Sequence, residues 1–451
     1  MMRIHRPQLI DKKKNSINLS PPSLLALGFL SFIFIGTLLL KLPFAHYGNV
    51  SWLDAIFTAT SAVTITGLSV VNIGESYTLF GQIVVMSLIQ CGGLGFMTFA
   101  ILAALSLSPK IGLKQQIMAQ ETIGQTSLAN ATFTIKGVLI YSLFFEGIGI
   151  VILTLAWTPQ YSFSESLFYA TFYSISAFNN GGFSLFPNSL MSFSGQYLIT
   201  FTISLLYIIG GIGFVVLMDI KRAQKWKKLT TNSKLILSTI LGLNVFAFII
   251  LWCLEASNPH TLQSMSVGQQ AVNAWFHATV PRSSGFNSLD MSQMSNASAL
   301  VTMLLMFIGG GSLSTAGGIK VGTFIILILS VINFLRRSEE LTVFNHAISE
   351  KVIFKALAVV SITGMLIMIG FFSLLILEPK KHFLDLLFEA VSAACTVGLS
   401  RGITEDLHPA SLVVLMLLMF AGRLGPLTLA YLIATPRKSR IRHPSADIQV
   451  G

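Results

Sequence analysis

Apolar residues occur in long, nearly unbroken runs along this chain, and polar residues gather in the connections between the runs. Each run is long enough to cross about 30 Å of hydrocarbon as a helix that rises 1.5 Å per residue. The pattern therefore predicts eight membrane-spanning helices. The eight runs cover residues 23–42, 79–107, 137–157, 197–218, 235–254, 298–335, 353–377 and 411–434.

The composition favours a membrane protein. The chain has 451 residues, of which 53% are hydrophobic and 10% are charged, and its mean hydropathy is +0.74. Globular domains carry about 25% charged residues, so this chain has too little charge to cover a water-exposed surface. No short apolar run with a cleavage site follows the basic N-terminus, and we expect the first helix to be retained. The three cysteines and eight histidines do not cluster, so neither a disulfide framework nor a metal site is predicted.

The distribution of charge predicts the orientation. Lys and Arg gather in the N-terminal arm, in the second, fourth and sixth connections and in the C-terminal tail, which share one side if there are eight spans. We therefore expect both termini to be cytoplasmic, and we attribute the net charge of +11 to topology rather than to nucleic-acid binding. Acidic residues prevail on the other side, where a negative mouth would raise the local cation concentration; solvated loop charges without a function explain this bias equally well. The residues assigned to the outer side are Lys41, Arg282, Lys380, Lys381 and Arg401 against Asp54, Glu75, Glu165, Glu255, Asp290, Glu378, Asp385, Glu389, Glu405 and Asp406.

A semi-apolar segment precedes every second span, and the four copies align. They read "SAVTITGLS" (61–69), "SAFNNGGFS" (176–184), "TVPRSSGFN" (279–287) and "SAACTVGLS" (392–400). Each holds one aligned glycine, followed by Leu or Phe and preceded ten residues earlier by an aromatic residue; a second glycine cluster follows at a similar distance. The aligned glycines are Gly67, Gly182, Gly285 and Gly398.

These segments predict four repeats of helix, half-helix, glycine turn and helix. About ten residues span only half a bilayer, and non-helical backbone at that depth must be buried in protein or line a water-filled pore. Four such turns around one axis would present a ring of backbone carbonyls, which replace the water of a dehydrated cation, and glycine allows the required positive φ. A single glycine would be read as an ordinary turn, and the glycine clusters of the second, fourth and eighth spans as packing seams. The expected divisions are an arm (1–20), repeats at 21–108, 109–219, 220–335 and 336–436, and a tail (437–451).

The sixth span is longer than a straight crossing requires. Its middle reads "GGGSLSTAGGIK" (309–320), a poor helix former, so we expect two half-helices joined by an intramembrane loop. Arg423 stands in the middle of the last span, where a charge is a functional candidate. It would repel a cation electrostatically and hydrogen-bond loop carbonyls when the pore is closed. We interpret Glu146 as a packing or salt-bridge residue and Glu389 as a structural anchor.

Together these motifs resemble the Trk/Ktr/HKT superfamily, and specifically the membrane subunit of bacterial Ktr potassium-uptake systems, over residues 20 to 436. Thr396, Val397 and Gly398 match the first part of the potassium-channel filter "TVGYG", whose remaining "YG" is absent. The resemblance implies K⁺ uptake, often stimulated by Na⁺, through one pore in each protomer of a homodimer, with a cytosolic ring of nucleotide-binding subunits. It also implies that Gly67 favours K⁺ over Na⁺, and that residues 309–318 lie under the filter as a gate. The expected filter residues are Thr66, Gly67, Gly181, Gly182, Ser284, Gly285, Thr396, Val397 and Gly398, and the expected gate residues are Gly309, Gly310, Gly311, Ser312, Thr315, Gly317, Gly318, Lys320 and Arg423.

Two other functions are weaker. A K⁺/Na⁺ symporter with alternating access would predict inverted repeats and intramembrane carboxylates, whereas these repeats run in the same direction. A membrane enzyme ranks last, because no nucleophile–base set or metal-ligand cluster occurs in the spans, and no cofactor is expected. The basic segments Lys221–Lys228 and Arg437–Arg442 suit a regulatory subunit or anionic lipid, although topology alone explains them equally well.

Overall fold

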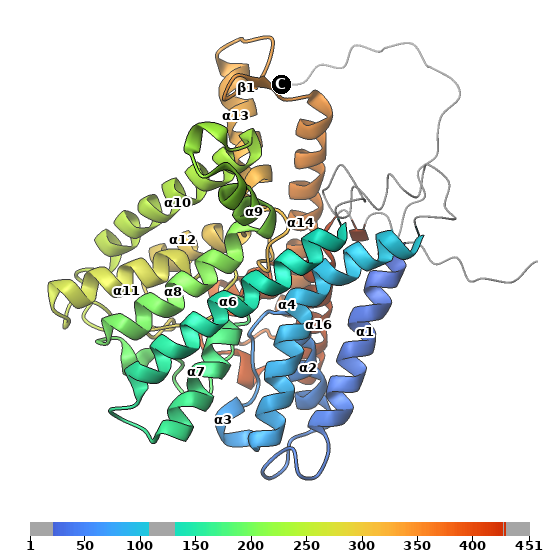
Figure 1. Ribbon diagram of the computed structural model, residues 1–451. Coiled ribbons are helices and arrows are strands. Elements are labelled where there is room, and N and C mark those ends of the chain that lie inside the picture. The colour runs from blue at the N-terminus through green and yellow to red at the C-terminus, as the bar shows by residue number, and fades with distance from the viewer. Residues whose placement is uncertain (1–20, 108–130, 427, 430–451) are drawn as a thin grey trace, which may run out of the picture.

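The computed structural model describes residues 21–107, 131–426, 428 and 429, and these are mainly α-helical (Figure 1). The N-terminal arm and the tail lie outside the described residues, so the location of both termini stays a prediction. The long helices follow the predicted apolar runs. They are α1 (Pro21–Leu40), α4 (Leu79–Leu107), α6 (Ala131–Trp157), α8 (Tyr197–Ile212), α10 (Thr231–Glu255), α14 (Glu350–Leu377) and α16 (Pro409–Leu424).

The outward faces of these helices are apolar. Among the described residues, α1, α6, α10 and α14 are each long and apolar enough to cross a membrane. Only 28–39% of their apolar stretches is buried within the chain, and Phe34, Leu155 and Ile369 are between 64% and 69% exposed. Large exposed apolar surfaces of this kind are stable against lipid rather than water. The chain is therefore a membrane protein with several apolar helices.

Four half-helices lie where the sequence predicts them. Each has 12 to 16 residues, fewer than the roughly 20 that a full crossing needs. Three of the four begin with a capping box, in which an N-cap serine and a side chain three residues later satisfy each other's backbone N–H groups. The half-helices are α2 (Trp52–Thr64), α7 (Phe163–Phe178), α11 (Val267–Thr279) and α15 (Phe383–Ala394).

Each half-helix packs against the long helices next to it in the sequence, and the four groups form a closed ring. α2 packs on α1 and α4, α7 on α6 and α8, α11 on α10, and α15 on α14 and α16. α4 contacts α6 and α7, α8 contacts α11, α12 (Asn296–Phe307) contacts α15, and α16 returns to α2. This order brings the ends of all four half-helices to one centre.

Three of the predicted spans are interrupted within the described residues. The eighth was expected to run over 411–434, but α16 ends at Leu424, where Gly425 has a φ of 81°. The sixth span divides into α12 and α13 (Val321–Leu335), joined by residues 308–320, as predicted. The fourth was expected to run straight over 197–218, and this prediction is wrong. It bends by 90° at Gly213, between α8 and α9 (Phe214–Ala223). Gly213 has a φ of 103°, which glycine adopts without strain.

Short elements occupy the connections. α3 (Ile73–Ser76) follows the first glycine segment. A small antiparallel hairpin of β1 (Thr342–Val343) and β2 (His346–Ala347) lies between α13 and α14. Single 3₁₀ turns lie at Met191–Phe193, Trp226–Lys228 and Thr404–Asp406.

Candidate cation-binding site

The four aligned glycines share an unusual backbone conformation. Gly67, Gly182, Gly285 and Gly398 have φ values of 93°, 68°, 70° and 89°. The residue two positions earlier in each loop is also left-handed, although none of these is a glycine. They are Ile65, Asn180, Ser283 and Thr396, with φ between 49° and 74°.

Left-handed φ is costly for β-branched residues such as Ile65 and Thr396, so the surrounding packing must hold them. Residues of positive φ that alternate with residues of negative φ turn successive carbonyls toward the same side of the chain, and each of the four loops has this alternation. The loops are thus built to present carbonyl oxygens in one direction. Oxygens presented in this way suit a dehydrated monovalent cation.

The four glycines meet one another in cyclic order. A Cβ atom added to Gly67 would lie 2.7 Å from the carbonyl oxygen of Gly181, and one added to Gly182 would lie 2.8 Å from the Cα of Gly285. One added to Gly285 would lie 2.8 Å from the carbonyl oxygen of Val397, and one added to Gly398 would lie 2.0 Å from that of Thr66. The ring is therefore closed, and it leaves no room for a side chain at any of the four positions.

A cavity of about 360 Å³ opens on one side of this ring. All four aligned glycines line it, together with the residues that follow them. Its charged lining residues are Asp290 and Glu405. The expected negative mouth is thus limited here to these two carboxylates.

Serine hydroxyls behind two of the loops hold the aligned glycines. Ser61 Oγ accepts the N–H of Gly67 at 3.0 Å, and Ser392 Oγ accepts the N–H of Gly398 at 3.1 Å. Both serines are fully buried. They stand six residues before the glycine, at the first letter of the quoted segments, where all four copies have Ser or Thr. This role of the serines was not predicted from the sequence, although the recurring hydroxyl at this position indicates it.

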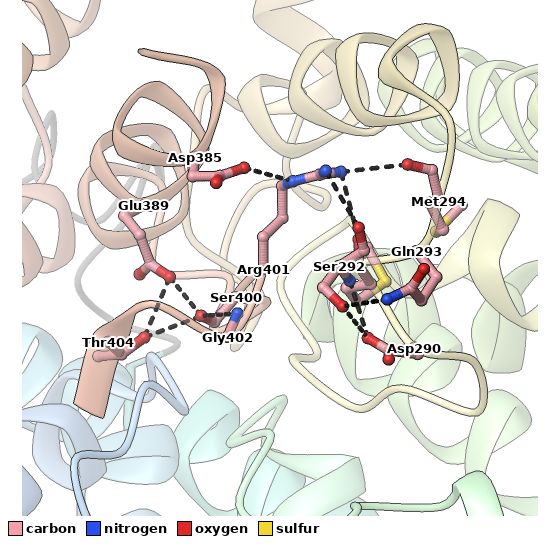
Figure 2. Close-up of polar contacts among 11 residues, drawn as sticks. Asp290, Ser292, Gln293, Met294, Asp385, Glu389, Ser400, Arg401, Gly402 and Thr404 are labelled. Atoms are coloured by element: carbon pink, nitrogen blue, oxygen red, sulfur yellow. Dashed lines mark hydrogen bonds and ion pairs between the residues drawn. The ribbon is translucent and has the colours of Figure 1, made fainter. Parts of the chain in front are cut away.

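Loop four is also anchored on its outer side (Figure 2). Arg401 Nε donates to Asp385 Oδ1 at 2.7 Å, and its other nitrogens donate to the carbonyls of Met291, Ser292 and Met294. This guanidinium therefore joins the start of α15 to the segment after the third loop.

A second anchor in the same view is Glu389, a buried carboxylate of α15. It accepts hydrogen bonds from the hydroxyls of Ser400 and Thr404. These bonds fix the chain just beyond Gly398, in agreement with the predicted anchoring role of Glu389.

The loop of residues 308–320 lies directly against the inner side of loop four. A Cβ atom on Gly317 would lie 1.9 Å from Thr396 Oγ1 and 2.5 Å from the carbonyl oxygen of Cys395. Its other end contacts the bend at Gly213, because Gly311 N donates to Gly211 O at 2.8 Å and Phe214 N donates to Leu313 O at 3.1 Å. The bend thus provides the notch that receives the loop. The glycines Gly309, Gly310, Gly311 and Gly317 each approach other backbone too closely for a Cβ atom.

Two cations contact this loop. Arg423, in the last turn of α16, donates to Thr315 O at 2.6 Å and to Gly92 O at 2.9 Å. Lys320, the N-cap of α13, reaches back to Ala316 O at 2.6 Å. The predicted hydrogen bond between Arg423 and a loop carbonyl is therefore present.

The other glycine clusters are packing seams, as predicted. A Cβ atom on Gly92, Gly210 or Gly422 would lie 1.9–2.2 Å from a carbonyl in the last turn of α2, α7 or α15. The long helices thus touch the half-helices backbone to backbone, as small residues allow in membrane helix pairs.

Several charges differ from their predicted surroundings. Arg282 was counted as an outer-loop cation, but it is buried, and its Nη1 lies 3.5 Å from Ile240 O in α10. Glu255 and Glu389 were counted with the outer charges, and both are buried acceptors of hydrogen bonds. The packing interpretation of Glu146 is confirmed, since its described partners are the hydroxyl and amide groups of Ser142, Gln90 and Asn179.

The apolar helices and the central ring of loops define a class, that of helical membrane transport proteins with re-entrant segments. The chain belongs to the TrkH family, described as "cation transport protein", whose model matches residues 23–442. This family makes the chain a transport protein rather than an enzyme.

Curated relatives extend along the whole chain. It is 43% identical to the Ktr system potassium uptake protein B of Bacillus subtilis over 98% of this chain and 99% of that protein. It is 33% identical to the potassium/sodium uptake protein NtpJ of Enterococcus hirae over 98% and 100%. Among solved structures, the potassium transporter TrkH from Vibrio parahaemolyticus has the same fold, with a TM-score of 0.75, 20% identity and coverage of 94% of this chain and 86% of that one.

Proposed function

We propose that this protein takes up potassium across the cytoplasmic membrane through a pore, and that the four-loop ring selects the ion that enters it. The ions would be coordinated by backbone carbonyls of Thr66, Gly67, Gly181, Gly182, Ser284, Gly285, Thr396, Val397 and Gly398. Eight spanning helices in four repeats would surround this one pore. The relatives named as potassium uptake proteins support K⁺ as the transported ion.

The observation that carries the proposal is the closed ring of four left-handed glycines beneath a cavity. Each glycine contacts the next loop, and the same cavity touches all four. Carbonyl oxygens turned to one centre can replace the hydration shell of K⁺ without any charged side chain. In the resembling family, a serine at the position of Gly67 goes with a preference for Na⁺. The glycine found here therefore favours K⁺.

The loop of residues 309–318 is the proposed gate. It packs against loop four through Gly317, and Arg423 holds its Thr315 carbonyl. A guanidinium at this depth also repels a cation that leaves the ring. Movement of this loop away from Thr396 would open the path.

Regulation would come from outside the chain. The relatives are named as parts of a Ktr system, which supports a separate regulatory subunit. The homodimer and the cytosolic nucleotide-binding ring are what the resemblance implies. A basic surface at the end of α9 and just after it would face this ring or anionic lipid. Its exposed residues are Lys221, Arg222, Lys225, Lys227 and Lys228.

The alternative is a K⁺/Na⁺ symporter with alternating access. The relative named as a potassium/sodium uptake protein favours some role for Na⁺. Activation by Na⁺ is the better explanation, because the ring of loops forms one continuous site and the four repeats run in the same direction.

The test is uptake of ⁸⁶Rb⁺ into vesicles that contain the purified protein, with and without its regulatory ring. We expect Rb⁺ uptake that excess K⁺ abolishes by competition. We also expect Na⁺ to stimulate this uptake when its concentration is equal on both sides of the membrane. Stimulation that requires a Na⁺ gradient would favour the symporter. No uptake above empty vesicles, with or without the ring, would overturn the proposal.

A further inference from the structure

Ser283 occupies a special position in the third loop. It stands two residues before Gly285, where the other loops have Ile65, Asn180 and Thr396, and it shares their left-handed backbone with a φ of 74°. Its residue exposure is 1%. A buried serine in this conformation is held by its surroundings, and its hydroxyl must find partners there.

Both partners of that hydroxyl come from distant parts of the chain. Ser283 Oγ donates to the carbonyl oxygen of Thr396 at 2.6 Å, and it accepts the backbone N–H of Gly317 at 2.9 Å. Thr396 belongs to the fourth loop of the ring, and Gly317 belongs to the 309–318 loop. One oxygen atom therefore joins three segments.

The two partners also touch each other. A Cβ atom on Gly317 would overlap Thr396 Oγ1, so the 309–318 loop and the fourth loop meet without a gap at this point. The Gly317 N–H occupies a lone pair of the Ser283 oxygen and so directs the hydroxyl hydrogen toward Thr396. Departure of Gly317 would remove this constraint and leave the hydroxyl free to turn away.

We propose that Ser283 is the residue that couples the position of the gate to the ion affinity of the ring. The proposal rests on the proposed function of the ring and the 309–318 loop. With the loop in place, the hydroxyl fixes the Thr396 carbonyl; with the loop displaced, that carbonyl is released. Coupling between two sites is reciprocal, so K⁺ in the ring biases the loop by the same factor as the loop biases K⁺ binding.

The first experiment uses Ser283→Gly. Glycine keeps the left-handed backbone without strain, and the substitution removes the CH₂OH side chain and with it both hydrogen bonds of the hydroxyl. We expect the KM for ⁸⁶Rb⁺ and the maximal uptake velocity to rise together, each by about threefold to tenfold, the range that corresponds to one lost hydrogen bond. The matched control is Ser288→Ala in the same segment, whose buried hydroxyl has no hydrogen-bond partner among the described residues; its kinetics should stay at the wild-type values.

A second measurement follows the backbone of the 309–318 loop directly, first in the wild type and then in the same variant. Hydrogen–deuterium exchange of the peptide that contains Gly317 is followed in wild-type protein, in K⁺ and in N-methyl-D-glucamine. We expect the exchange rate to depend on K⁺ in the wild type and to lose that dependence in Ser283→Gly.

The outcomes separate the two proposals. Wild-type vesicles without Rb⁺ uptake would overturn the proposed function itself. Normal wild-type uptake, with Ser283→Gly changing the velocity but not KM, would overturn only the coupling. The coupling would also be overturned if hydrogen–deuterium exchange of the Gly317 peptide in the wild type were the same with and without K⁺.

Discussion

The guanidinium of Arg423 lies between two backbone carbonyls, that of Thr315 at 2.6 Å and that of Gly92 at 2.9 Å. One side chain thereby ties the last turn of α16 both to the 309–318 loop and to α4. Hydrogen bonds from a charged donor are stronger than neutral ones, and this one is 6% exposed. The contact holds the loop against the ring.

Replacement of Arg423 should therefore release the proposed gate, the 309–318 loop. We expect Arg423→Ala to raise the maximal rate of K⁺ uptake several-fold in a potassium-uptake-deficient strain, because the charged hydrogen bond to Thr315 is worth about 1.5–3 kcal/mol. Arg423→Lys keeps the charge but lacks the fork that reaches two carbonyls, and it should give an intermediate rate. The control is Arg336→Ala at the exposed end of α13. If Arg423→Ala is expressed at the wild-type level and its uptake rate is unchanged, Arg423 has no role in gating.

Selectivity should depend on Gly67. Gly67→Ser places a Cβ atom 2.7 Å from Gly181 O at a φ of 93°, so the first and second loops must separate. We expect the preference for K⁺ over Na⁺ to fall, measured as the ratio of the two uptake rates at equal concentration. Gly48→Ser is the matched control, since Gly48 also has a positive φ, of 70°, but has open space around it. If both variants keep the wild-type ratio of K⁺ to Na⁺ uptake rates, the first loop does not contribute to ion selectivity.

The central ring was largely predictable from the sequence, because one glycine recurs in register in four half-span segments. The left-handed residues before the glycines were not. Ile65 and Thr396 are β-branched, and their local preference opposes the conformation that they adopt. Only the packing of four converging loops imposes it, and no local pattern reports that packing.

The broken fourth span was missed for a similar reason. The cluster around Gly213 reads as a seam between helices, and nothing within α8 or α9 predicts a 90° bend. The bend is held by hydrogen bonds to the 309–318 loop, about a hundred residues later in the chain. The break of the sixth span, in contrast, was predicted, because its own segment "GGGSLSTAGG" is a poor helix former.

The serines behind the ring should support its shape. Ser392→Ala leaves the buried N–H of Gly398 without its acceptor, which costs about 1–3 kcal/mol. We expect a lower melting temperature and weaker discrimination against Na⁺, and the same changes in Ser61→Ala, which acts on Gly67. Ser373→Ala is the control, because the half-buried hydroxyl of Ser373 donates to Ile369 O within its own helix, α14. Wild-type discrimination in both ring variants would show that the glycine N–H groups need no acceptor there.

The contact between Gly317 and Thr396 gives the most direct test of the gate. Gly317→Ala adds a methyl group 1.9 Å from Thr396 Oγ1 and 2.5 Å from Cys395 O, so one of the two loops must retreat. Thr396 is fixed within the ring by its neighbours, whereas Gly317 stands in a glycine-rich segment, and we expect the gate loop to yield. Uptake should then become fast without the regulatory ring, and the KM for ⁸⁶Rb⁺ should rise because the Thr396 carbonyl is released.

Gly322→Ala is the matched control for this variant, because Gly322 lies in the first turn of α13 with nothing within 4 Å of an added Cβ atom. It should leave both rate and selectivity unchanged. A Gly317→Ala protein with a normal rate and a weakened preference for K⁺ would mean that the ion-binding loop gave way instead. The 309–318 loop would then be more rigid than the ion-binding loop, and this result would contradict the proposal that it moves as a gate.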